Sequence, residues 1–397
     1  MTALTSRQRL LRTFDGQETD HLPCCFMSFT ALRRRYQGDR YDVVKAQREM
    51  GLDAMLFVPV APRALRPEHP DLRGLPVRFD PRVQTSVWRE TGKGAQRADI
   101  LRREYVTPGG TLTTSVRLSE DWPHGERLPF VDDYQVPRAI KRLVTGPEDL
   151  DALRYLLVAP QDEDVARFRQ EARQAQAFAE EHGVLLAGGW GVGMDMANWL
   201  CGMQDLMILT MTQPGLVADL LEMIHQWNVQ RMQVVLDAPV DLYIRRAWYE
   251  GCDFVTPSFF GEVVLPRLRA EVDLAHAHGT RFGYICSSGT RPMLDAYLEA
   301  GIDVLIGIDP VQGTHTDMPY LKQRLGKRVC LWGGVSGAVT VEQGTEEQVR
   351  VAVRKAVATL GPARFVLSPI DNITVDEPRT WENVEVLIDE WRRHWGE

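Results

Sequence analysis

Eight short apolar runs that alternate with helix-patterned segments constrain the fold of this chain more than any other feature. The apolar runs cover residues 22–29, 54–60, 184–189, 240–247, 280–286, 304–309, 328–333 and 364–368. Helical periodicity fills the gaps between the later runs, at residues 162–181, 214–236, 258–278, 291–300, 345–360 and 380–395. Buried strands that alternate with helices are typical of a parallel sheet covered by helices. The pattern predicts an α/β fold of the closed (β/α)8 TIM barrel class.

An open, doubly wound sheet produces the same local pattern, so sequence motifs are needed to distinguish the two folds. No GxGxxG or GxxxxGKS/T motif follows the first apolar run, which favours the barrel over a Rossmann or P-loop fold. A helix precedes that run, because Thr5 and Gln8 have the spacing of a capping box and the helix ends near Gly16.

Residues at about 62–145 interrupt the alternation, and we interpret them as an insertion in one domain that spans residues 1–397. The insertion is rich in Pro and Arg, and its segment REYVTPGGTLTTSVRL predicts a β-hairpin folded at Pro108-Gly109-Gly110. A connection of this length commonly forms a lid, a pocket wall or an interface. Four of its arginines either meet an anionic substrate or form a solvated face: Arg97, Arg102, Arg103 and Arg117.

Composition excludes several classes of protein. The 46 basic and 54 acidic residues give a net charge of -8 without a long run of one sign, so no nucleic-acid partner is expected. No apolar stretch approaches the roughly 20 residues that span a bilayer, and the N-terminus lacks the pattern of a secretory signal. The six cysteines are scattered without a CxxC pair, which indicates reduced thiols in a cytoplasmic protein.

The ends of the predicted strands carry a candidate metal site, because barrel enzymes place their chemistry there. Tyr284 and Cys286 are two residues apart on one strand and therefore share a face. Together with Asp371, after the last strand, they would offer three ligands to zinc and leave one position open. The alternative is that Cys286 is a buried apolar residue and Tyr284 a core aromatic.

Acidic and aromatic residues complete the predicted rim. Glu250 and Asp309 are candidates for a general acid or base, and Tyr249 beside Glu250 is a third candidate catalytic residue. Structural roles are the alternative, since the Asp309-Pro310 pair is typical of a loop-starting turn. Four aromatics are candidates for binding a flat or apolar substrate, with core packing as the alternative: Phe29, Trp190, Trp248 and Trp332.

Several segments together resemble the uroporphyrinogen decarboxylase superfamily, and they occur in that superfamily's order and spacing. They read RLLRTFDGQETDHLP, FVTPSFFGEVVLPRLRAEVDLAHAHG, CSSGTRPMLDAYLEAGIDVL, WGGVSGAVTVEQGTEEQVRVAVRKAV and FVLSPIDNITVDEPRTWENV. The resemblance implies a (β/α)8 fold over most of the chain outside residues 62–145.

Two branches of the superfamily supply candidate reactions. True decarboxylases carry an RQAGR stretch after strand one and an Asp at the end of strand two, where this chain has FMSFTALRRRY and FVPVAP. The corrinoid-linked methyltransferases carry a zinc site whose His-x-Cys and distant Cys correspond by motif to Tyr284, Cys286 and Asp371. Only the middle ligand is kept in this sequence.

The resemblance therefore implies a methyltransferase that acts on a small substrate, uses zinc and exchanges methyl groups with a corrinoid on a partner protein. A decarboxylase (carboxy-lyase) that acts on a porphyrinogen or another aromatic carboxylate is the alternative, with arginines of the insertion holding the carboxylates. A third possibility is a protein that binds a corrinoid or tetrapyrrole without turning it over. A homodimer is also expected.

Overall fold

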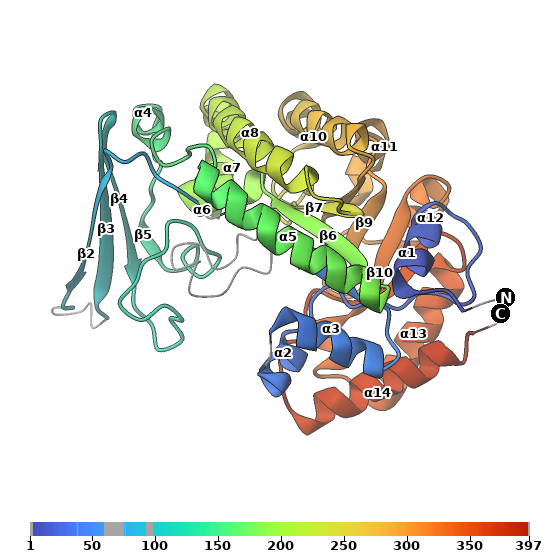
Figure 1. Cartoon of the computed structure of the whole chain (residues 1–397). Coiled ribbons are helices and arrows are strands. Elements are labelled where there is room, and N and C mark those ends of the chain that lie inside the picture. Colours follow the sequence, from blue (N-terminus) through green and yellow to red (C-terminus); the bar gives the residue numbers. More distant parts are fainter. Residues whose placement is uncertain (1–2, 38, 59–74, 76, 93–97, 396–397) are drawn as a thin grey trace. The chain divides into compact units, whose positions relative to one another are not determined.

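The computed structural model describes residues 3–37, 39–58, 75, 77–92 and 98–395 (Figure 1). Its residues form two compact units. The first comprises Met1–Val60, Glu171–Gly189 and Leu236–Glu397, and the second comprises Ala61–Gln170 and Trp190–Val235. The expectation of one domain over residues 1–397 stays a prediction.

A parallel sheet of seven strands is the centre of the α/β arrangement. Its spatial order is β1 (Met55–Val58), β6 (Leu185–Gly191), β7 (Leu242–Arg246), β8 (Arg281–Ile285), β9 (Val304–Ile308), β10 (Cys330–Ser336) and β11 (Phe365–Ile370). Nearly every residue of these strands is buried, as expected of strands covered on both faces. The curled sheet and its helices are consistent with a TIM-like barrel.

The apolar run at residues 22–29 does not form the strand that its composition predicts. Cys24 and Cys25 make only isolated parallel bridges, to Leu367 of β11 and to Asp53 just before β1. The N–H of Cys25 donates to the carbonyl of Leu367 at 3.0 Å, and the N–H of Asp53 donates to the carbonyl of Cys24 at 2.8 Å. Pro23 cannot donate a backbone hydrogen bond, so the pairing stays short. This segment nevertheless lies between the two edge strands of the sheet.

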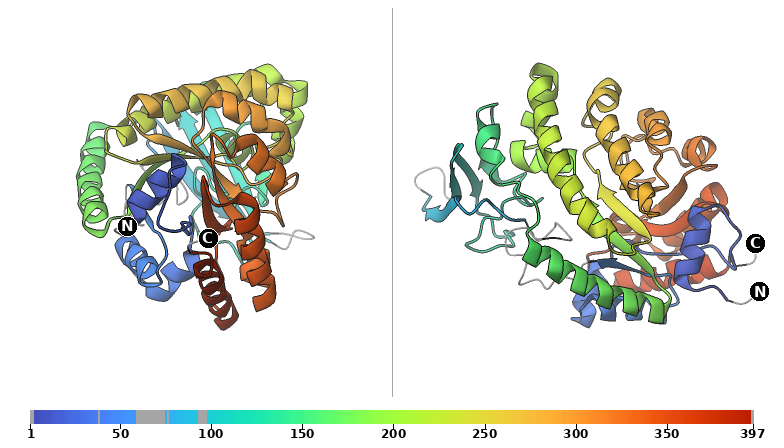
Figure 2. Two further views of the ribbon diagram at one scale, coloured as in Figure 1. Left: turned by 90° about the vertical axis from the view of Figure 1, so that its right-hand side faces the viewer. Right: turned by 45° about the horizontal axis from the view of Figure 1, so that its top comes forward.

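Helices follow the strands and cover the outer face of the sheet. In the left view of Figure 2, the later helices lie around the outside of the curved strands. They are α10 (Leu265–Ala277), α11 (Leu294–Ala300), α12 (Met318–Leu325), α13 (Glu346–Leu360) and α14 (Pro378–Arg392). The predicted helix at residues 258–278 is divided into α9 (Pro257–Phe259), a π-helical turn at Phe260–Val264, and α10.

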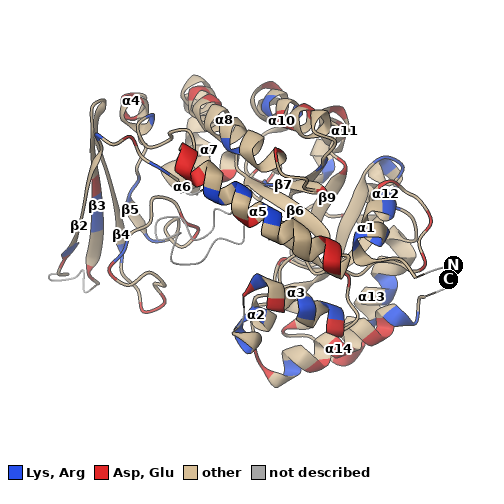
Figure 3. Cartoon of the chain, in the orientation of Figure 1, with Lys and Arg blue, Asp and Glu red and all other residues tan. Residues whose placement is uncertain are grey.

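The first helices frame the start of the sheet. Helix α1 (Ser6–Phe14) begins with the predicted capping box, in which Thr5 and Gln8 each accept a hydrogen bond from the other's backbone. Two further helices, α2 (Thr30–Tyr36) and α3 (Arg40–Glu49), precede β1. In Figure 3, Lys and Arg are interspersed with Asp and Glu along α3 and α14.

The second unit contains a separate antiparallel sheet. Its order is β2 (Gln84–Glu90), β3 (Ile100–Thr107), β4 (Gly110–Arg117) and β5 (Ala139–Lys141). Strands β3 and β4 pair from Ile100 opposite Arg117 to Thr107 opposite Gly110. Residues 62–74 and Arg97, which belong to the expected insertion, lie outside the described residues.

Two arginines of this sheet have structural partners. Arg103 is buried and donates to the carbonyl of Leu128 at 2.7 Å, while its guanidinium lies over the ring of Tyr105. Arg102 forms an ion pair with Glu90 at 2.6 Å. These contacts favour the structural interpretation of both residues.

Helices complete the second unit: α4 (Asp149–Leu153), α6 (Met194–Cys201), α7 (Met203–Thr212) and α8 (Pro214–Leu236), with α5 (Asp162–His182) leading into β6.

Within the described residues, no single helix has the length and apolarity to cross a bilayer. Only α7 and α8 taken together reach that length and composition, and they are bent by 119°.

Candidate functional site

A buried polar network connects the end of β7 to β8 and α10. Arg245 on β7 donates to Glu250 at 2.5 Å and to Glu271 of α10 at 2.9 Å. The phenol of Tyr284 on β8, which lies opposite Arg245 in the sheet, donates to the second oxygen of Glu250 at 2.5 Å. These side chains are at most 3% exposed, so the network is shielded from water.

Burial and neighbouring charges together determine the protonation states of Arg245 and Tyr284. Burial lowers the pKa of Arg245, but the carboxylates of Glu250 and Glu271 outweigh burial and raise it above its usual value. Burial raises the pKa of Tyr284 well above its usual value, and the negative charge of Glu250 raises it further. Arg245 therefore stays charged and Tyr284 stays a protonated donor at neutral pH.

The network lies on the helix side of the sheet. Arg245 contacts Glu271 of α10, and the ring of Tyr284 packs against Tyr297 of α11 with centroids 5.2 Å apart. Cys286 follows on the same face, where its sulfur accepts a hydrogen bond from the Tyr297 hydroxyl at 3.4 Å. Tyr284 and Cys286 thus share a face, but that face is turned toward α10 and α11.

The predicted zinc ligands Tyr284, Cys286 and Asp371 lie in different surroundings. The Tyr284 hydroxyl is bound to Glu250, and Cys286 is fully buried beside Tyr297. Asp371, directly after β11, is exposed. Within the described residues, neither Cys286 nor Asp371 belongs to a group of three or more His, Cys, Asp and Glu side chains close enough to share an ion. The assignment of these three residues as zinc ligands stays a prediction.

Asp309 anchors the loop that follows β9. Its carboxylate accepts hydrogen bonds from the backbone N–H groups of Val311 at 2.8 Å and Gln312 at 3.0 Å, and the residue is 2% exposed. This geometry is the loop-starting turn that the Asp309-Pro310 pair indicates. These contacts favour the structural alternative for Asp309, and its role as a general acid or base stays a prediction.

Two of the predicted aromatics pack within the first unit. Trp332 is fully buried, donates its indole N–H to the carbonyl of Cys25 at 2.9 Å and lies 6.0 Å from the ring of Phe14. These are the contacts of a core residue, so they favour core packing over a substrate pocket for Trp332. Phe29 is 6% exposed and lies 5.5 Å from the ring of Trp381.

Three further aromatics lie at strand ends. Tyr249 is half-buried and makes an edge-to-face contact with Phe254, with centroids 5.2 Å apart. Trp190, in the second unit, is 8% exposed and has a φ of 129°, a backbone conformation that is rare for a residue with a side chain. Trp248, after β7, is half-buried.

Arg246 is a candidate that the sequence patterns missed. Successive residues of a strand point to opposite faces, so Arg246 faces the inner side of the sheet while Arg245 faces the helices. Its guanidinium lies 4.4 Å from the centre of the Trp248 ring, and the residue is 3% exposed. The sequence did contain a signal for this residue, because Arg245 and Arg246 stand together at the end of an apolar run. A charged side chain buried at such a position requires a partner. A guanidinium beside an indole at this position can bind a planar anion.

Comparisons with known protein families and solved structures each match a large part of the chain. A family model described as uroporphyrinogen decarboxylase (URO-D) matches residues 119–394. The structure is similar to a methyltransferase from Methanosarcina mazei, with a TM-score of 0.59 and 16% identity over 98% of this chain and 99% of that chain. A B12-independent methionine synthase from Shewanella sp. W3-18-1 gives a TM-score of 0.45 and 10% identity over 94% and 97% of the two chains. A search of curated protein sequences found no match.

Proposed function

Since the chain belongs to the uroporphyrinogen decarboxylase family, we propose that it is an enzyme that transfers a methyl group to or from a small anionic substrate. The substrate lies on the inner side of the sheet, at the carboxy-terminal ends of the strands. The observation that carries this proposal is the guanidinium of Arg246 stacked on Trp248 at the end of β7. Barrel enzymes hold their substrates at this end of the sheet.

Arg246 and Trp248 contact different parts of the proposed substrate. A guanidinium has five N–H donors in one plane and binds a carboxylate through two parallel hydrogen bonds, alongside any protein partner. The indole supplies a flat apolar surface next to that anion. The adjacent Arg245 network holds the end of β7 rigidly, because its members are buried and ion-paired.

The proposed reaction class rests on the resemblance of the sequence to the methyltransferase branch of the family. The likeness to the Methanosarcina mazei methyltransferase extends over almost the full length of both chains, and at 16% identity it supports the fold. In the proposed reaction, the bond between the methyl group and its donor breaks, the donor keeps the electron pair, and the methyl group forms a bond to the acceptor. A corrinoid on a partner protein supplies the methyl-exchanging centre, while residues of this chain bind and orient the substrate.

The proposal is tested with the purified full-length protein and free cob(I)alamin in place of the partner. Methoxy, methylthio and methylamino compounds that carry a carboxylate are the donors, and formation of methylcobalamin is followed by its absorbance. We expect transfer from at least one donor, with kcat/KM at least tenfold lower for Arg246→Lys. Absence of transfer from every donor overturns the proposal.

A decarboxylase is the second candidate, because Arg246 and Trp248 also fit an aromatic carboxylate. Release of CO2 from an aromatic acid or a porphyrinogen, without methyl transfer, would establish this activity in its place. Tight binding of a corrinoid or tetrapyrrole with neither product would instead indicate a binding protein.

A further inference from the structure

Three loops meet at the carboxy-terminal ends of β7, β8 and β9. The N–H of Cys252, after β7, donates to the carbonyl of Gly289 at 2.9 Å, and the N–H of Gly289, after β8, donates to the carbonyl of Thr314 at 2.9 Å. The Thr314 hydroxyl, after β9, donates to the carboxylate of Asp253. These bonds form a closed chain between the loops and hold Cys252 and Asp253 beside the loop that carries His315.

Gly289 permits this close approach. Its φ is +61°, and a Cβ at this position would lie 2.6 Å from the backbone nitrogen of Cys252 and 2.7 Å from that of Asp253. Both neighbours are backbone atoms, which cannot move aside as a flexible side chain would. Residue 289 must therefore be a glycine for the loops to keep this arrangement.

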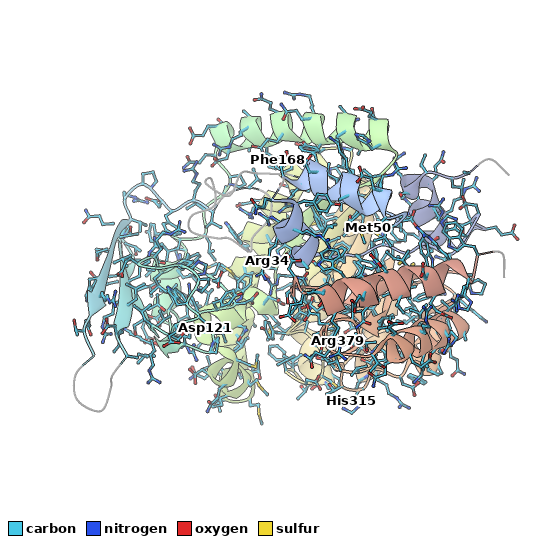
Figure 4. The ribbon with its side chains drawn as sticks, turned by 90° about the horizontal axis from the view of Figure 1, so that it is seen from below. Arg34, Met50, Asp121, Phe168, His315 and Arg379 are labelled. Atoms are coloured by element: carbon cyan, nitrogen blue, oxygen red, sulfur yellow. The ribbon has the colours of Figure 1, made fainter. Side chains whose placement is uncertain are left out.

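The loops bring together a thiol, a carboxylate and an imidazole. The ligand atoms of Cys252, Asp253 and His315 all lie within 4.8 Å of one another. Cys252 and Asp253 are half-buried, and His315 is exposed and lies at the edge of the drawn side chains in Figure 4. The group is thus anchored on one side and open to solvent on the other.

This donor set matches zinc. Zinc takes Cys sulfur at about 2.3 Å and His nitrogen or carboxylate oxygen at about 2.0 to 2.2 Å, usually with four ligands in a tetrahedron. A thiolate and an imidazole favour zinc over the hard cations Mg²⁺ and Ca²⁺, which prefer oxygen ligands. The ligand atoms of the three side chains lie within 4.8 Å of one another, so one ion between them would be within reach of all three.

We propose that Cys252, Asp253 and His315 bind one zinc ion and leave its fourth position open to solvent or substrate. This site shares no residue with Tyr284, Cys286 and Asp371. The site requires neither Arg246 nor methyl transfer, so its test can fail or succeed whatever the outcome of the test of the proposed function. An open position on zinc lowers the pKa of a bound water or thiol and provides an anionic nucleophile near neutral pH.

The test measures zinc binding by the full-length protein after removal of metals with a chelator. Zinc is titrated in competition with a chromophoric chelator, and bound metal is counted by elemental analysis. We expect one equivalent per chain for the wild type and at least tenfold weaker binding for Cys252→Ser and for His315→Ala. Circular dichroism and thermal melting check that both variants are folded.

Two matched controls distinguish zinc bound at this site from zinc bound elsewhere on the chain. His278→Ala removes another exposed histidine, and Asp371→Asn removes a carboxylate of the site predicted from the sequence; zinc affinity should be unchanged in both. Loss of binding in Asp371→Asn, or equal binding by wild type and the Cys252→Ser/His315→Ala double variant, overturns the proposal.

A second readout identifies the thiol directly. Co²⁺ in place of zinc should give the near-ultraviolet band of a thiolate–cobalt bond in wild type and not in Cys252→Ser. Zinc should also slow alkylation of Cys252 by iodoacetamide, followed by mass spectrometry of the peptide. Alkylation at the same rate with and without zinc overturns the proposal and would instead favour a thiol nucleophile assisted by His315.

Discussion

The phenol of Tyr284 donates a hydrogen bond to the carboxylate of Glu250 at 2.5 Å, and both side chains are completely buried on the helix side of the sheet. This relationship identifies Glu250 as a member of a structural network. Arg245 and Tyr284 satisfy one oxygen each of its carboxylate, and Arg245 in turn joins the network to α10. The network positions the end of β7, where Arg246 faces the opposite side.

Tyr284→Phe should destabilise the protein by about 1 to 3 kcal/mol, because it leaves a buried carboxylate oxygen without its donor. Urea denaturation followed by circular dichroism measures the change. Tyr36→Phe is the matched control, since Tyr36 is 50% exposed and its loss should cost less than about 0.5 kcal/mol. Equal stabilities of the two variants would contradict the structural role of Tyr284.

Arg245→Met should destabilise the protein more than Tyr284→Phe, because the buried carboxylates of Glu250 and Glu271 would both lose their ion pair with Arg245. Breaking a buried ion pair in this way costs about 3 to 5 kcal/mol. The control is Arg154→Met, which removes the partner of Asp151 from a pair in which both side chains are more than half exposed, and it should cost about 1 kcal/mol or less. Thermal unfolding of both variants provides the comparison, and a smaller effect at Arg245 than at Arg154 would refute the prediction.

Arg246→Lys should change function more than stability. Lysine keeps the charge but loses the planar guanidinium that stacks on Trp248. If the substrate carries a carboxylate, KM should rise at least tenfold while the melting temperature changes little. An unchanged KM for the active donor would show that Arg246 does not bind substrate.

His21 should make the protein less stable in mild acid. Its ring stacks on Trp395 with centroids 4.2 Å apart, and burial, together with the charge of Arg9, lowers its pKa to about 4. The unfolded chain has a histidine pKa of about 6.5, so it binds the proton first as the pH falls. Stability is therefore full above about pH 6.5 and decreases between pH 6.5 and 4, by up to about 3 kcal/mol.

The His21 prediction is checked by denaturation at several pH values. His21→Phe keeps a ring against Trp395 but cannot take up a proton, so its stability should lose most of the slope between pH 6.5 and 4. Asp20 forms an ion pair with Arg9, which helps to hold its pKa below its usual value, and it should contribute only below about pH 4. The same slope in wild type and variant would exclude His21 as its source.

Asp309 provides a further test of positioning against catalysis. Asp309→Asn keeps an oxygen that accepts from Val311 and Gln312, whereas Asp309→Ala leaves both N–H groups without this acceptor. Asn should retain most activity, while Ala should lose activity and increase hydrogen exchange at residues 311–317. Equal loss of activity in both variants would favour Asp309 as a general acid or base.

Most strands could be predicted from local patterns. Runs such as 304–309 and 364–368 are apolar in their central residues, because a parallel strand covered on both faces cannot contain many polar side chains. The capping box of Thr5 and Gln8 is equally local and formed as predicted. The strand predicted at residues 22–29 does not form, because apolar content alone does not ensure pairing with a neighbouring strand. Pro23 also limits the backbone hydrogen bonds that this segment can make.

The candidate site depended on information that no local pattern contains. The sequence by itself determined that Tyr284 and Cys286 share one face and that Arg245 and Arg246 point to opposite faces, since strand residues alternate with a period of two. Only the tertiary structure decided which face is turned toward α10 and α11, through the contacts of Arg245 with Glu271 and of Tyr284 with Tyr297. It alone also brought Cys252 and His315 together, because parallel strands end at the same edge of a sheet however far apart they lie in the chain.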